Sequence, residues 1–433
     1  MQNAARVNAT LLDRVRAYFE RRPIAAFLII LLIGLIARLI MLPGDGFLID
    51  QQQYYEWAAC ANNNGVFGLY RCAATPNYPP LIPALLGLSL SLYRVFGDVS
   101  IPLQNNPALL AMLKLPGLLF EVALISLFFY IAYKKAGVWW ASFVIAALYW
   151  NPGFATVTAW WGQTDAIYSF FLLLTAYLLV QRRPRLLWFV FGLAILTKFQ
   201  SIEFLPILGI LSLRRFGWKT TAVGCTLFVL TFALGELPFF LGSGALARAP
   251  FSNSVNLFPY ISNGAHNFWF WVSGSSPTVL LDNLKVVGGI SYFQAGVVLL
   301  VVGTAIICLR AWVLNDRADV YLLFAAANFT FYMLPTQIQV RYLYPGVMFL
   351  ALAMIRDRRL IVLYIVTALA FTHNVFAAVW LGIGLLFYPS KLLFWKPVHD
   401  ALAMTAVYIT LMAIFMRPLL SRSLFLRGND GKR

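Results

Sequence analysis

A long polar loop, residues 45–83, contains the carboxylate best suited to chemistry in this sequence. In it Asp50 is followed by Gln-Gln-Gln-Tyr-Tyr-Glu-Trp. In a helix Asp50, Tyr54 and Trp57 share a face, because residues three and four positions apart are neighbours. A carboxylate beside aromatic rings at a membrane surface can take a proton from a hydroxyl of a sugar or lipid while the rings stack on the molecule that carries this hydroxyl. The pattern predicts a catalytic base at Asp50 and leaves open an ordinary helix N-cap.

Two basic residues in apolar surroundings are candidates to bind a phosphate. Lys198 lies within LAILTKFQSIEFLP, with Glu203 five positions on. A charge at that depth in an apolar segment is costly and marks either a site or a paired charge. A Lys198–Glu203 ion pair is the structural alternative. Arg341, in QIQVRYLYP, can clamp a phosphate with two hydrogen bonds. Its alternative is to reach lipid headgroups with an extended side chain.

Other side chains are candidates for substrate binding. Gln163 and Asp165 stand in WGQTD, where Asp165 could instead interact with a helix dipole. His266 stands in SNGAHNFWFW, and its ring could line a sugar pocket, although tryptophans are common at any membrane interface. The aromatic candidates in or near the first loop are Tyr54, Tyr55, Trp57 and Tyr78.

The elements that position these residues are membrane helices. The 433 residues are 61% hydrophobic and 11% charged, whereas soluble domains have about 25% charged residues. Apolar stretches recur that are long enough to cross about 30 Å of hydrocarbon. The alternating strands of a membrane barrel are absent. The sequence predicts an all-α polytopic membrane protein that forms one integral-membrane domain over residues 1–433.

The net charge of +17 reflects membrane topology and gives no indication of nucleic-acid binding. Most of the 33 Lys and Arg residues form short clusters between apolar segments. Placing every cluster in the cytoplasm gives about twelve crossings with both termini cytoplasmic. Residues 186–213 are too short for two full crossings, so we expect two short helices broken near Lys198. The predicted parts are a first span (24–42), a first outer loop with interfacial helices (43–106), spans 2–7 (107–241), a second outer loop (243–292) and C-terminal spans (293–417).

The sequence predicts no cofactor. The three histidines are scattered and no Cys-x-x-Cys pair exists, so neither a zinc site nor another divalent metal is indicated. Glycine fingerprints for nucleotide binding are missing. Cys60 and Cys72 share the first outer loop, and the sequence leaves open whether they form a disulfide.

Several motifs together resemble the GT-C superfamily of integral-membrane glycosyltransferases. Asp50 with the following aromatics, and then NYPPLIPAL, is similar to dolichyl-phosphate-glucose glucosyltransferases. NPGFATVTAWWGQTDAIYSFFLL and LTKFQSIEFLP resemble bacterial relatives of the GPI-anchor mannosyltransferases. RYLYP resembles an element of other bacterial members. The resemblance covers most of the chain in order, through short motifs.

The resemblance implies a GT-C-like fold and an inverting transfer of a hexose, glucose or mannose, from a polyprenyl-phosphate donor to a lipid-linked glycan or other outer-face acceptor. It implies that Asp50 is the base and that Lys198 and Arg341 hold the donor phosphate. It also implies an active site on the outer or lumenal face of the membrane. The short loops and compact ends favour a bacterial inner membrane, where this face is periplasmic. Two departures exist: Asp45 and Asp50 do not form the paired Asp-x-Asp of many members, and Gln339-Val340 replaces a basic residue before Arg341.

Two other functions compete with this prediction. A transporter or lipid flippase would use the charges of Glu121, Glu203, Glu236 and Lys198. The two long outer loops and the absence of inverted repeats argue against it. An O-antigen ligase or polymerase would use a diphosphate-linked donor and arginines in a late outer loop, where residues 243–292 offer only Arg248 and His266.

Overall fold

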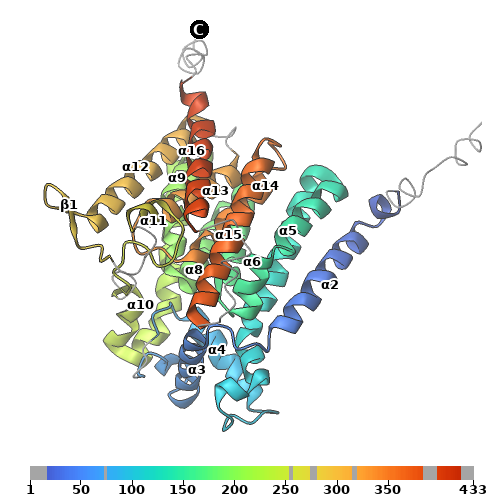
Figure 1. Ribbon diagram of the computed structural model, residues 1–433, viewed down its shortest axis with the longest axis vertical. Helices are drawn as coiled ribbons and strands as arrows, with labels where there is room; N and C mark the ends of the chain where they lie inside the picture. The colour runs from blue at the N-terminus through green and yellow to red at the C-terminus, as the bar shows by residue number, and fades with distance from the viewer. Residues whose placement is uncertain are drawn as a thin grey trace, which may run out of the picture.

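The protein is a bundle of apolar helices. The computed structural model describes residues 17–72, 76–252, 257–273, 280–314, 319–383 and 397–420. Within them, six helices are long and apolar enough to cross a membrane, and a bent pair would make a seventh. The six lie in α2 (Pro23–Met41), α5 (Pro107–Tyr149), α9 (Leu205–Ser243), α12 (Tyr292–Leu314), α15 (Leu360–Ile383) and α16 (Pro397–Leu420) (Figure 1). The chain is therefore an all-α polytopic membrane protein. The expected count of about twelve crossings is not confirmed.

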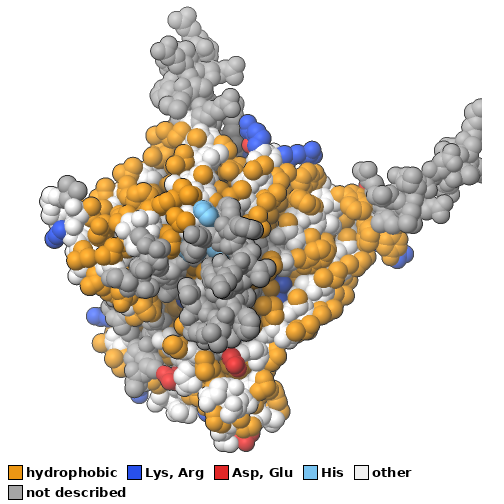
Figure 2. Space-filling model, viewed as in Figure 1, with side chains coloured by type: hydrophobic (Ala, Val, Ile, Leu, Met, Phe, Trp, Pro, Cys, Tyr) orange, Lys and Arg blue, Asp and Glu red, His pale blue; other side chains and the backbone are white. Residues whose placement is uncertain are grey.

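The surface of the bundle fits this conclusion. Figure 2 shows hydrophobic side chains over most of the viewed face between its two ends. Exposed aliphatic residues are especially frequent on α2 and α12, for example Ile36, Ile40 and Val301. Apolar side chains that face outward along a whole helix are stable in lipid and costly in water.

Helix α5 reverses direction at Gly137, which has a φ of 77°. Before this glycine, Lys114 Nζ donates to the carbonyl oxygen of Gly44, just after the end of α2. Just after it, the ring of Trp139 contacts Phe19, before the start of α2, and at the end of the second half Trp150 Nε1 donates to the carbonyl of Ile30, within α2. The two halves therefore run in opposite directions beside α2. Gly137 permits the turn because only glycine adopts a positive φ without a steric penalty.

Helix α9 contains a similar break at Gly217, with a φ of 78°. Helix α8 (Pro184–Thr197) packs on both halves, since Trp188 Nε1 donates to Ser212 Oγ and the same indole covers Gly224. As predicted, the helical path is interrupted at Lys198, whose backbone is extended (φ −153°, ψ 122°). A 3-10 segment, Phe199–Phe204, then leads into α9.

Short apolar helices fill the centre of the bundle. They are α7 (Asp165–Val180), α8, α13 (Val320–Met333) and α14 (Tyr344–Ala353). Every residue of α14 is buried, and so are all but one of the residues of α13. A helix that is apolar on all sides must be surrounded by other helices. These central helices form the rigid framework against which the polar segments rest.

The first polar loop folds into α3 (Leu48–Asn63), a 3-10 turn (Val66–Gly68), α4 (Leu81–Tyr93) and a second 3-10 turn (Leu103–Asn105). Helices α3 and α4 lie together at one end of the bundle (Figure 1). They pack closely, because a Cβ on Gly87 would come within 2.7 Å of Ala61 Cβ. With 13 residues, α4 is too short to cross hydrocarbon about 30 Å thick.

Cys60 and Cys72 form a disulfide that closes part of this loop, 12 positions apart in sequence. A cross-link that closes a loop of this length restricts the unfolded chain and so adds about 2–3 kcal/mol to the free energy of unfolding. We therefore expect the double variant Cys60→Ser, Cys72→Ser to be cleaved at least about tenfold faster by a protease within residues 45–83. Cys225→Ser, which changes a cysteine outside any disulfide, is the control. Equal cleavage rates in the two variants would contradict this prediction.

The second polar loop contains η6 (Gly244–Arg248), α10 (Ala249–Ser252), α11 (Phe268–Val272) and a two-stranded antiparallel sheet of β1 (Lys285–Val287) and β2 (Ile290–Ser291). It lies against the segment before Arg341, since the amide of Asn263 donates to the carbonyl of Ile338. Both termini, which we expected in the cytoplasm, lie outside the described residues.

Candidate active site

Asp50 is held by two side chains from a distant turn. Its Oδ2 accepts hydrogen bonds from Trp161 Nε1 at 2.8 Å and from Gln163 Nε2 at 2.7 Å. Asp50 stands in the first turn of α3, whose N-cap is Phe47. The ordinary N-cap function is therefore excluded. Asp50 is half-buried, so its carboxylate is fixed in direction and still accessible to a ligand.

Tyr54 determines which way the Gln163 amide faces. Its hydroxyl donates to Gln163 Oε1 at 3.0 Å, which leaves the amide nitrogen to donate to Asp50. Burial, with a smaller contribution from neighbouring Tyr78, raises the pKa of Tyr54 well above its usual value of 10.0. The phenol therefore remains protonated and remains a donor throughout the neutral pH range. The relay Tyr54–Gln163–Asp50 joins two candidates from α3 with one from the WGQTD motif.

The turn that carries Trp161 and Gln163 lies between two helical segments bent by 118°. Before it come α6 (Pro152–Ala155) and a π-helical segment, Thr156–Trp160. Two side chains hold the turn: Gln51 Nε2 donates to the Trp161 carbonyl at 2.6 Å, and Lys114 Nζ to the Trp160 carbonyl at 2.8 Å. Sequence reasoning missed Gln51, Lys114 and Trp161. The position of Lys114 in an apolar helix was the available signal.

Gly162 is the residue of this turn that packs tightly against the side chains of Lys114 and Gln51. Its φ is +75°, and a Cβ there would lie 2.6 Å from Lys114 Cγ and 2.7 Å from Gln51 Nε2. We expect Gly162→Ala to lower kcat at least about tenfold, since it moves the two donors to Asp50. Gly137→Ala is the matched control, with a φ of +77° and no atom within 4 Å. Both variants place alanine at a positive φ, which costs about 1–3 kcal/mol. Thermal unfolding measures this strain, and transfer rates measure the displacement of the donors to Asp50. Equal transfer rates would show that the turn does not position Asp50.

Lys198 and Arg341 converge on one buried carboxylate. Lys198 Nζ lies 2.7 Å from Asp165 Oδ1, and Arg341 Nε lies 3.4 Å from Asp165 Oδ2. The expected alternative, a Lys198–Glu203 pair, is not observed. Instead, Glu203 Oε1 accepts a hydrogen bond from Asn328. The three segments that meet here are the start of α7, the break after α8 and the 3-10 turn Val340–Leu343.

The cations of this cluster exceed the anion that balances them. Asp165 is fully buried, Lys198 is 1% exposed and Arg341 is 8% exposed. Arg341 Nε is buried and forms no hydrogen bond, because its contact with Asp165 has only ion-pair geometry. Asp50, beyond the Trp161 ring, also acts on Arg341, so the feature that favours an anionic ligand is two cations held together with an unused Nε–H donor. Burial also argues against the alternative in which Arg341 reaches out to lipid headgroups.

Arg341 connects this cationic group to the Asp50 relay. Its guanidinium lies 5.1 Å from the centre of the Trp161 ring, and Trp161 is a donor to Asp50. Its NH2 group also lies 3.4 Å from Tyr78 Oη. The carboxylate that could act as a base and the cations that could bind a phosphate are therefore separated by one aromatic side chain.

Several aromatic rings pack together next to the Asp50 relay and the cluster of Lys198 and Arg341. Tyr54, Trp57 and Tyr78 contact one another, with ring centres 5.4 to 6.4 Å apart. Tyr55 is partly buried and packs against the same apolar cluster. Tyr54 and Trp57 are buried, at 3% and 1% exposure, so they support the half-buried ring of Tyr78, which is the one of the three with a face available to a sugar.

His266 lies in a different polar cluster. Its Nδ1 is 2.7 Å from Asp400 Oδ2, and its backbone amide donates to Asn374 Oδ1 at 3.1 Å. The hydrogen bonds and ring contacts of His266 among the described residues involve neither Asp50, Lys198 nor Arg341. The structure thus brings together all the predicted site residues except His266.

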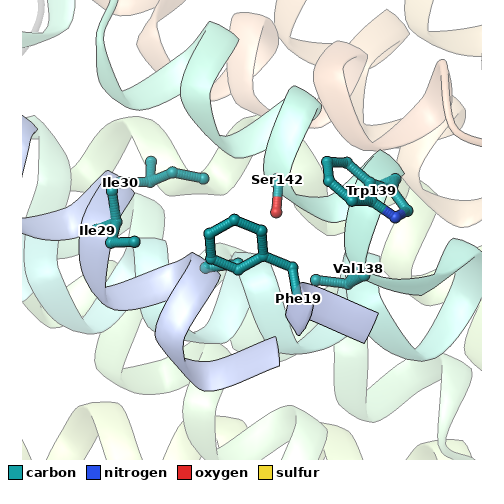
Figure 3. A pocket seen from close by; sticks show the side chains of 7 residues that line it. Phe19, Ile29, Ile30, Val138, Trp139 and Ser142 are labelled. Carbon is teal, nitrogen blue, oxygen red and sulfur yellow. The ribbon is translucent and has the colours of Figure 1, made fainter. Parts of the chain in front are cut away.

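A small apolar pocket of about 140 Å³ lies away from these groups, between α2 and the second half of α5 (Figure 3). Phe19, Ile30, Trp139 and Ser142 are among its lining residues, and none of the lining residues is charged. It has no group that could bind a phosphate or activate a hydroxyl, so it is not part of the candidate site.

No known protein family matches this sequence, and no curated protein matches it. Among solved structures, the chain is similar to the crystal structure of ArnT from Cupriavidus metallidurans bound to undecaprenyl phosphate. The two share 15% sequence identity over 90% of this chain and 76% of that chain, with a TM-score of 0.49. Chains as divergent as these two need not share a ligand or a reaction.

Proposed function

We propose that this protein is a GT-C-type glycosyltransferase. It would move a hexose, glucose or mannose, from a polyprenyl-phosphate donor to a lipid-linked glycan or another acceptor at the outer face of a bacterial inner membrane. The observation that carries the proposal is that the Trp161 indole lies between a fixed carboxylate, Asp50, and the buried guanidinium of Arg341. Lys198 contacts the same Asp165 carboxylate as Arg341. The sequence motifs shared with this superfamily support the same reaction.

The proposed reaction is a single displacement. Asp50 takes the proton of the acceptor hydroxyl as that oxygen attacks C1 of the donor sugar, and the C1–oxygen bond to the lipid phosphate breaks. Both hydrogen bonds to the Asp50 carboxylate reach Oδ2, so Oδ1 can accept this proton. Attack opposite the leaving group inverts the anomeric centre. Proton removal by a positioned carboxylate accelerates such reactions by about 10²–10⁴-fold.

Lys198 and Arg341 would stabilise the phosphate as it leaves. Negative charge increases on the bridging oxygen when the C1–oxygen bond breaks, and cations fixed in a low-dielectric site interact strongly with it. Asp165 holds the two cations in place before the donor binds. Tyr78, half-buried and in contact with Arg341, would stack on the sugar, and the buried rings of Tyr54 and Trp57 would hold it in place.

The transporter alternative is disfavoured by the local pairing of its charges. Glu121 binds Arg38 through two hydrogen bonds of 2.6 and 2.7 Å. Lys198 is paired with Asp165, and Glu203 is bonded to Asn328. Among the described residues the fourth charge, Glu236, has a buried Oε1 without a hydrogen-bond partner. Three of the four charges are thus held by fixed partners and one is not, and a single such group does not form a continuous path for a moving substrate.

A transfer assay tests the proposal. Purified protein would be incubated with radiolabelled polyprenyl-phosphate glucose or mannose and a total lipid extract. We expect label to move into a new product with one of these donors. Transfer only from diphosphate-linked donors would favour the ligase or polymerase. Movement of substrate across vesicles without a new glycosidic bond would favour the flippase.

A further inference from the structure

A second polar cluster, distinct from the candidate active site, consists of His266, His373 and Asp400. These residues come from the second polar loop, the middle of α15 and the first turn of α16. His266 and Asp400 are 134 positions apart in sequence, and His373 and Asp400 are 27 apart. Because spacing this wide matches no metal-binding motif, the sequence alone predicted no metal site. The fold places two of the three histidines in the chain beside one carboxylate.

The three side chains converge tightly. The Nδ1 atoms of His266 and His373 lie 2.7 and 2.5 Å from the same oxygen of Asp400. One ligand-type atom from each residue lies within 4.8 Å of the other two. Tetrahedral zinc with nitrogen and oxygen ligands at about 2.0–2.1 Å separates its ligand atoms by about 3.3 Å. The two N···O separations are hydrogen-bond distances and are shorter than this, so an ion would enter if Asp400 and the imidazoles moved apart by about 0.6–0.8 Å.

The surroundings of the cluster would orient metal ligands. Asn374 accepts a hydrogen bond from the His266 backbone and another from Tyr332 Oη, at 3.1 and 2.8 Å. Its own amide group donates to the Gly264 carbonyl at 2.8 Å. These bonds hold the loop residue His266 against α13 and α15. Ligands of metal ions are commonly oriented by such surrounding hydrogen bonds.

The geometry points to a binding site for a divalent transition-metal ion, with zinc as the best-fitting member, formed by His266, His373 and Asp400. Imidazole nitrogens and a carboxylate are typical zinc ligands, and three protein ligands leave one position for water. Asp400 and His266 are almost completely buried and His373 is half-buried. The ion would fasten the second polar loop to α15 and α16. The alternative is a His–Asp–His hydrogen-bonded network without metal.

The test measures metal content directly. Full-length protein would be purified with a tag that contains no histidine and exposed to Zn²⁺. It would then be dialysed against metal-free buffer to remove unbound ions, and its zinc content would be measured by elemental mass spectrometry. We expect about one zinc ion for each chain, and Co²⁺ in its place should give the visible absorption bands of nitrogen- and oxygen-bound cobalt. In His373→Ala we expect retained metal to fall at least about tenfold. Asp400→Asn gives a second variant should His373→Ala fold poorly.

His399→Gln is the matched control. It removes the remaining histidine, one residue from Asp400 on the same helix but outside the three-residue cluster. It should retain zinc like the unchanged protein. Absence of bound Zn²⁺ or Co²⁺ in the unchanged protein would overturn the inference in favour of the hydrogen-bonded network. Equal loss of metal in His399→Gln and His373→Ala would show that the assigned ligands are wrong. Neither result depends on glycosyl transfer.

Discussion

Asp50→Asn is expected to abolish glycosyl transfer while leaving the protein folded and able to bind its donor. Asparagine has nearly the same shape as aspartate, and its side-chain oxygen can still accept from Trp161 Nε1 or Gln163 Nε2. It cannot remove a proton from a hydroxyl. The predicted decrease in kcat is about 10²–10⁴-fold, the usual contribution of a general base. The rate would be measured with a radiolabelled polyprenyl-phosphate hexose at saturating acceptor.

Asp45→Asn is the control for this experiment. It makes the same chemical change in the same loop, at an exposed carboxylate five positions earlier. It should transfer sugar at the rate of the unchanged protein and should show the same thermal unfolding. Comparable donor KM values in both variants would show that Asp50 acts on the acceptor. Normal turnover by Asp50→Asn would eliminate it as the base.

The helical membrane fold and much of the candidate site could be predicted from sequence, because both depend on local patterns. Apolar length identifies spanning helices. The spacing of Asp50, Tyr54 and Trp57 correctly indicated one helix, α3. The unusual apolar surroundings of Lys198 indicated a break in the helical path, which the structure contains.

The partners of these residues could not be predicted, because they depend on contacts distant in sequence. Asp50 is bonded to residues 111 and 113 positions away. Lys198 was expected beside nearby Glu203 and instead binds Asp165, 33 positions earlier. Local spacing favoured Glu203, and the packing that brings Asp165 to Lys198 leaves no signal in the nearby sequence. The number of crossings was also uncertain from sequence, since buried short helices such as α13 and α14 are as apolar as spanning ones.

Lys198→Gln is expected to weaken donor binding and also to lower kcat, because the phosphate gains negative charge as it leaves. Glutamine can still donate a hydrogen bond to Asp165, but it has no positive charge for the phosphate. Losing a charge-assisted hydrogen bond costs about 1.5–3 kcal/mol, which raises the donor KM by about 10- to 150-fold. Lys285→Gln, which removes an exposed cation in β1, is the control and should leave the donor KM unchanged.

A thermal-shift measurement separates this binding function from a purely structural one. Lys198 is one of two cations around Asp165, so its loss could lower stability without affecting any ligand. A ligand at free concentration L stabilises the folded state by RT ln(1 + L/Kd), so a weaker binder at the same concentration adds less. Polyprenyl phosphate at 100 times its Kd would add about 2.7 kcal/mol to the unchanged protein, and about 0.4 kcal/mol to a variant that binds it 100-fold more weakly. If Lys198 only balanced the charge of Asp165, the variant would unfold at a lower temperature but gain as much from the lipid phosphate as the unchanged protein does. A smaller gain in Lys198→Gln, and a similar loss in Arg341→Gln, would instead place the phosphate at this pair of cations, one indole ring from the carboxylate that activates the acceptor.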